Sequence, residues 1–169
     1  MNNSCKTSWE CQRDLAFLDK DRAERLDLYL PKTTSKRTLI LYIHGGSFCT
    51  GDKASPRSLS ICPDLAEAGY AVASVNYKLS TGTEGDDRWD AWPQNLADCR
   101  QAWAFMSEQA SRWNLDEDRF VLMGSSAGAT LALLLACALG QNENSPAALI
   151  NLYGRVDWFR DTVPLKRHS

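Results

Sequence analysis

Residues 119–139 read RFVLMGSSAGATLALLLACAL, and this stretch decides the fold class of the chain. Residues 119–123 are typical of a short strand, and residues 130–139 are apolar on every side, which predicts a buried helix. The G-x-S-x-G pentapeptide, residues 124–128, lies at the corner between them. A tight turn there projects Ser126, and the flanking glycines remove side chains that would clash. A glycine-rich turn that only begins a helix is the alternative, but the strand and helix around it favour a nucleophile elbow.

A second glycine-rich motif lies upstream, where residues 38–43 predict a buried strand that leads directly into HGGSF, residues 44–48. Acyl transfer needs hydrogen-bond donors aimed at the developing oxyanion, and a glycine-rich loop offers unobstructed backbone N–H groups. His44 is expected to brace this loop. A simple strand-ending turn is the alternative, which the nearby serine corner makes weaker. The predicted oxyanion donors are the backbone N–H groups of Gly45, Gly46, Ser47 and Ala127.

Predicted strands and helices alternate along the chain. The strands are expected at residues 24–30, 38–43, 71–77, 119–123 and 148–153. The helices are expected at residues 56–68, from Pro93 through an apolar stripe that ends at Trp113, and at 130–139. This order predicts an α/β fold with a mostly parallel sheet and helices on both faces. The 169 residues are expected to form a single domain, with residues 1–20 as an N-terminal extension.

Taken together, the motifs resemble the α/β-hydrolase family, and most of all its carboxylesterase branch with feruloyl-esterase-like, acetyl-esterase and kynurenine-formamidase members. The stretches that carry the resemblance are LDLYLP at 26–31, HGGSF at 44–48, GDK at 51–53, VNYKL at 75–79, PQNLAD at 93–98 and GSSAG at 124–128. The resemblance implies hydrolysis of a small ester or arylformamide through an acyl-enzyme on Ser126, with no cofactor and no metal. Ser47 and Ala129 stand where many relatives have glycine.

This interpretation leaves the general base unassigned. In the family a serine, an acid and a histidine follow one another along the chain. Asp157 and His168 are the weak candidates after Ser126. Further strand–helix units, each on the order of 30 residues, are expected to be missing after residue 156. Three hypotheses compete: the N-terminal part of a longer esterase, a non-catalytic binding or interaction module, and a complete short hydrolase that uses His168.

Charge and composition restrict the classes of molecule that the chain is expected to bind. A formal net charge of −2 with scattered basic residues argues against nucleic acid or an anionic membrane as partner. The first residues have no apolar core of a signal peptide, the longest apolar run is too short to span a bilayer, and the cysteines lack metal-ligand spacing. A cytoplasmic chain with reduced thiols and a small ester or amide as substrate is therefore expected. Self-association is also expected if the last strand lies at an uncovered edge.

Overall fold

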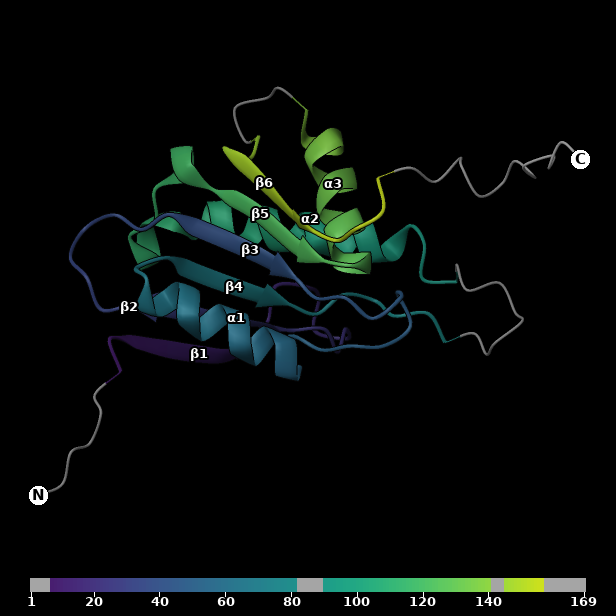
Figure 1. Cartoon of the computed structure of the whole chain (residues 1–169), viewed down its shortest axis with the longest axis horizontal. Coiled ribbons are helices and arrows are strands. Elements are labelled where there is room, and N and C mark those ends of the chain that lie inside the picture. The colour runs from purple at the N-terminus through teal and green to yellow at the C-terminus, as the bar shows by residue number, and fades with distance from the viewer. Residues whose placement is uncertain (1–6, 82–89, 141–144, 157–169) are drawn as a thin grey trace, which may run out of the picture.

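The structure is a computed structural model that describes residues 7–81, 90–140 and 145–156 (Figure 1). Its strands are β1 (Trp9–Leu15), β2 (Leu26–Pro31), β3 (Leu39–Ile43), β4 (Ala71–Val75), β5 (Val121–Ser125) and β6 (Ala148–Leu152). Its helices are α1 (Pro56–Glu67), α2 (Gln94–Glu108) and α3 (Ala127–Leu139), with short 3-10 helices at Ala110–Trp113 and Glu117–Arg119. Each predicted strand and helix is present within a few residues of its expected bounds.

The six strands form one sheet in the order β1-β2-β4-β3-β5-β6. The four strands β4, β3, β5 and β6 are parallel, whereas β1 and β2 pair antiparallel with their neighbours. The predicted mostly parallel sheet is therefore confirmed. Because parallel strands point the same way, the carboxyl ends of β3 and β5 lie at one side of the sheet (Figure 1). The glycine-rich segments that follow these two strands are brought together there.

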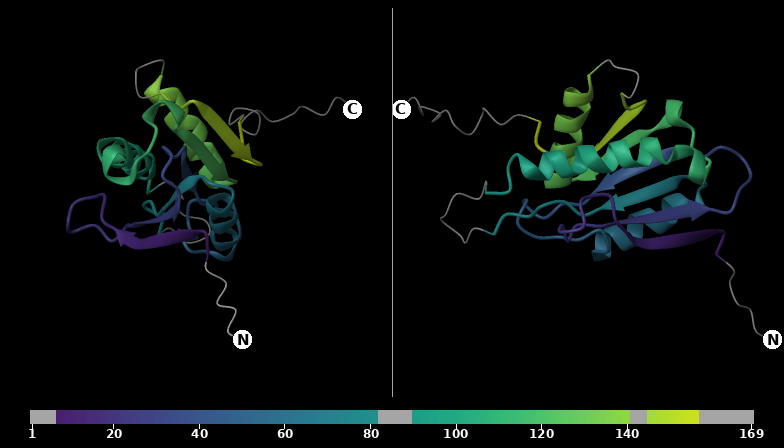
Figure 2. Two further views of the ribbon diagram at one scale, coloured as in Figure 1. Left: turned by 90° about the vertical axis from the view of Figure 1, so that its left-hand side faces the viewer. Right: turned by 180° about the vertical axis from the view of Figure 1, so that it is seen from behind.

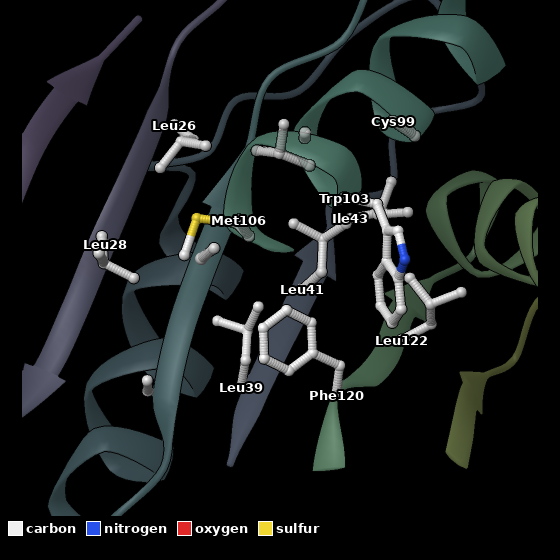
Figure 3. Close-up of a cluster of buried hydrophobic side chains, with 14 of the residues drawn as sticks. Leu26, Leu28, Leu39, Leu41, Ile43, Cys99, Trp103, Met106, Phe120 and Leu122 are labelled. Atoms are coloured by element: carbon white, nitrogen blue, oxygen red, sulfur yellow. The ribbon is translucent and has the colours of Figure 1, made fainter. Parts of the chain in front are cut away.

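Helices cover both faces of the sheet, as the sequence predicted (Figure 2). Cys62 and Ala66 of α1 pack on one face, against Tyr29, Ile40 and Val72. The larger core lies on the other face, between α2, α3 and the strands. Figure 3 shows Trp103 and Met106 of α2 among leucines from β2, β3 and β5. This two-sided burial explains why the central strands read as continuous apolar runs.

The first strand, β1, was not predicted. It falls within residues 1–20, which we expected to form an N-terminal extension, and it pairs with β2 at the edge of the sheet. Its sequence, WECQRDL, has charged and polar residues at most positions, and every side chain in it is at least partly exposed. An edge strand of this kind lacks the apolar run of a buried strand and the clean alternation of a half-buried one.

The corner between β5 and α3 differs slightly from its predicted bounds. Strand β5 extends through Ser125, and α3 begins at Ala127, so the pentapeptide itself supplies the end of the strand and the first turn of the helix. Within the described part of the chain, none of the helices has the length and apolarity needed to cross a membrane.

Candidate active site

Ser126 is the single residue between the end of β5 and the start of α3. Its backbone has φ of 52° and ψ of −121°, in the left-handed region that a residue with a side chain rarely adopts. The Ser126 N–H donates to the carbonyl of Leu152 at 2.9 Å, and its own carbonyl accepts from Thr130 N–H at 3.1 Å in the first turn of α3. The strand on one side and the helix on the other therefore hold the strained turn that the sequence predicted at this residue.

Two glycines make this tight corner possible. A Cβ atom at Gly124 would collide with the carbonyl of Gly128, and one at Gly128 would collide with the carbonyls of Ile43 and His44. The glycines therefore let the first turn of α3 touch the backbone at the end of β3. Any larger side chain at either position would push the serine corner away from the segment that follows β3.

That segment, residues 44–51, is called the glycine loop here. Gly46, Ser47 and Phe48 all have positive φ angles, and the Gly46 carbonyl accepts from the N–H groups of Cys49 and Thr50 at 3.0 Å. A Cβ atom at Gly46 would collide with the backbone of Thr50. The loop is thus a tight turn directly beside the serine corner.

The four predicted oxyanion donors differ in whether their N–H groups already have a hydrogen-bond acceptor. The Gly45 N–H donates to Ser125 Oγ at 3.1 Å, so it is already engaged. The N–H groups of Gly46 and Ser47 meet no hydrogen-bond acceptor among the residues that the structure describes. Ala127 is the first residue of α3, where an N–H group has no acceptor within the helix. Gly45 and Gly46 line the same pocket as Ser126, and Ala127 directly follows Ser126.

Ser125 takes part in this arrangement in a way that the sequence did not reveal. Its side chain is buried, and its Oγ lies 3.1 Å from both the Tyr42 hydroxyl and the Gly45 nitrogen. Burial raises the pKa of Tyr42, so this phenol stays protonated and can donate to Ser125. Ser125 thereby joins β3, β5 and the glycine loop. Only the inward alternation of strand side chains could have indicated that Ser125 points away from solvent.

His44 braces the glycine loop from behind. Its ring is buried, stacks on Tyr77 with centroids 4.5 Å apart, and has Nδ1 2.8 Å from the Gly45 carbonyl. The Tyr77 hydroxyl donates to the His44 carbonyl at 2.9 Å. Burial lowers the pKa of His44, which favours the neutral ring with its proton on Nδ1. This matches the bracing role expected from the sequence.

Lys53 lies two residues after the glycine loop and anchors this part of the chain to the sheet. Its ammonium lies 2.7 Å from Asp27 Oδ1 on β2 and 2.9 Å from Asp14 Oδ1 on β1. Its backbone N–H donates to Asn76 Oδ1 at 2.5 Å, and its carbonyl accepts from Ser74 Oγ at 2.7 Å. Burial by itself disfavours the ammonium, but the bonds to the two aspartates raise the pKa of Lys53 overall. The GDK stretch therefore fixes the loop to the sheet.

A pocket of about 210 Å³ opens beside Ser126. The glycine loop forms one wall through Gly45 and Gly46, and Arg57 of α1 and Tyr153 after β6 line it further out. The candidate acid and base, Asp157 and His168, lie outside the described residues. Among the described residues no group of three or more His, Cys, Asp or Glu side chains is arranged to hold a metal ion.

Comparison with known proteins shows which family this chain resembles. The sequence model of the BD-FAE family matches residues 26–160. The chain is 29% identical over 155 residues to ethyl acetate hydrolase of Pseudomonas putida, covering 88% of this chain and 46% of that protein. It is 33% identical over 111 residues to kynurenine formamidase avaC of Aspergillus versicolor, covering 62% and 37% respectively.

Solved structures show the same likeness. The carboxylesterase EstE1, cloned from a metagenomic library, superimposes with a TM-score of 0.74 at 25% identity, covering 88% of this chain and 48% of that one. The chain therefore spans about half the length, or less, of each of these three proteins.

Proposed function

The chain belongs to the BD-FAE family and has the α/β-hydrolase fold, and from this membership we propose that it carries the nucleophile half of a carboxylic ester hydrolase. The observation that carries the proposal is the strained turn at Ser126, beside the glycine loop and open to a pocket. The proposed substrate is a small ester or arylformamide. Both kinds of substrate present a carbonyl carbon with a leaving group, which this arrangement suits.

The proposed reaction has two steps. Ser126 Oγ attacks the carbonyl carbon as its proton passes to a general base, and the carbonyl π electrons move onto oxygen. Backbone N–H groups of Gly46, Ser47 and Ala127, with Gly45 once it leaves Ser125, stabilise this oxyanion. Collapse of the tetrahedral intermediate expels the alcohol or amine, which takes up the proton. Water then attacks the acyl-enzyme and releases the acid and free Ser126. The sequence candidates for base and acid are His168 and Asp157.

Covalent labelling tests this proposal without requiring full turnover. A neutral fluorophosphonate should add one adduct to the 169-residue chain, detected by intact mass and located at Ser126 by peptide mapping. The Ser126→Ala variant should take no adduct, whereas the neighbouring Ser125→Ala variant should still be labelled. An adduct that survives in Ser126→Ala would contradict the assignment. A folded chain that never takes the label would contradict an activated nucleophile at Ser126 in this chain.

A further inference from the structure

We infer that the pocket beside Ser126 accepts an ester that carries a carboxylate, and that Arg57 is the residue that selects this charge. The inference rests on the proposed function, because it describes the substrate of the same site. Arg57 is the only charged side chain among the described residues that line the pocket. The other lining residues are glycines, serines and two tyrosines.

The charge of Arg57 has no partner within the described part of the chain. None of the described carboxylates forms an ion pair with it, whereas Arg22 binds Asp98 at 2.6 Å and Lys53 binds Asp27 at 2.7 Å. Arg57 is exposed to solvent, so its side chain can be reached by a ligand. Here the unpaired guanidinium borders the same pocket as the candidate nucleophile, so a negatively charged group that enters the pocket meets an uncompensated positive charge.

Arg57 stacks on Tyr153, a second residue that lines the pocket. Its guanidinium carbon lies 5.4 Å from the centroid of the Tyr153 ring, and both residues line the pocket. Arg57 comes from the start of α1 and Tyr153 follows β6, so this contact joins two segments far apart in the sequence. A guanidinium that stacks on a ring keeps its N–H groups at its edge, where they can bind a carboxylate through two parallel hydrogen bonds.

Arg57 and Tyr42 line the same pocket. Burial raises the pKa of Tyr42, and the positive charge of Arg57 acts against this rise. Tyr42 in turn contacts Ser125, the residue before Ser126. The guanidinium therefore borders the same pocket as the groups proposed to surround the reacting carbonyl. A carboxylate a few bonds away from the ester would find its partner without leaving the pocket.

Two pairs of esters test the inference. They also show whether Arg57 selects a carboxylate on the acyl side or on the alcohol side of the ester. The acyl-side pair is mono-p-nitrophenyl adipate and p-nitrophenyl hexanoate, which have equal chain length and differ in charge. The alcohol-side pair is 4-acetoxybenzoate and phenyl acetate. Arg57→Gln should lower the charged-to-neutral ratio of kcat/KM on the order of tenfold for one pair, the loss expected for a charge-assisted hydrogen bond. Arg57→Lys should restore part of that ratio, and added salt should lower it in the unmodified chain.

Arg112 provides a matched control. Its guanidinium stacks on Trp113 at 5.1 Å, a similar contact outside the pocket, and Arg112→Gln should leave both ratios unchanged. Ratios that do not respond to Arg57→Gln, or that respond equally to Arg112→Gln, would overturn the inference while leaving the proposed function intact. Failure of the proposed function shows itself separately, as absence of the Ser126 label. In that case, binding of monomethyl adipate to Ser126→Ala, lost in Ser126→Ala/Arg57→Gln, would still support the charge selection, and equal binding by both variants would overturn it.

Discussion

Ser125 and Ser126 are neighbours in the sequence and both line the pocket, but Ser125 is buried whereas Ser126 is partly exposed. Ser126 lies at the pocket in a strained turn, whereas Ser125 is buried and bonds to Tyr42 and to the Gly45 N–H. We therefore expect Ser125→Ala to lower kcat for p-nitrophenyl acetate about 2- to 10-fold, because the glycine loop loses the hydrogen bond that positions it beside β5. KM should change little, because the loop N–H groups act mainly on the transition state.

Two further variants distinguish this positioning role from general damage. Ser125→Thr keeps the hydroxyl and should recover most of the lost kcat. Tyr42→Phe removes the other partner of Ser125 Oγ and should lower kcat in the same direction. A loss in Ser125→Ala as complete as that in Ser126→Ala would contradict our assignment of the two serines.

His44 should make stability depend on pH. Because burial lowers its pKa from the ordinary value of 6.5, the unfolded chain binds a proton at a higher pH than the folded chain does. The free energy of unfolding should therefore fall as pH drops below about 6.5, and this decline should flatten in His44→Gln. Urea unfolding between pH 5 and 7.5 measures the slope. The chain has one other histidine, and the same measurement in His168→Gln assigns whatever part of the slope is not due to His44.

At the scale of elements, the predictable parts were those with local signals. Strands β3 and β5 are continuous apolar runs, and the glycines at 124 and 128 mark the corner that follows β5. The edge strand β1 carries no such signal. The engagement of Gly45 by Ser125 could not be predicted either, because it depends on how closely the glycine loop approaches β5. The same holds for Arg57 and Tyr153, which tertiary packing alone brings together.

The anchor between Lys53 and β2 leads to a stability prediction. Asp27 is fully buried, so Lys53→Met would leave its carboxylate with the longer, 3.7 Å ion pair to the more exposed Arg13 as its remaining cationic partner. We expect a loss of about 3–5 kcal/mol in the free energy of unfolding, measured by urea denaturation. Asp27→Asn/Lys53→Met should lose less than the two single variants together. The exposed Lys32→Met serves as the control, and an equal loss there would contradict a specific role for the buried pair.

At the scale of the whole molecule, the central strands of the sheet are buried whereas one of its edge strands is partly exposed. Core packing from α2 and α3 buries the central strands, but β6 lies at one edge and, among the described strands, pairs with β5 alone. Its residues are half-buried or exposed, and Ile150 is 38% exposed. An apolar strand with one open edge offers unpaired N–H and carbonyl groups to another chain.

We therefore expect the 169-residue chain to self-associate through β6. Sedimentation velocity over a range of concentrations should show larger species as concentration rises. Ile150→Lys should shift the distribution towards the monomer, because a lysine on an edge strand opposes strand pairing. Leu59→Lys is the matched control, since Leu59 is 44% exposed but lies on α1. A monomer at every concentration would refute the expectation. An equal shift in both variants would attribute association to general surface hydrophobicity and not to the strand edge.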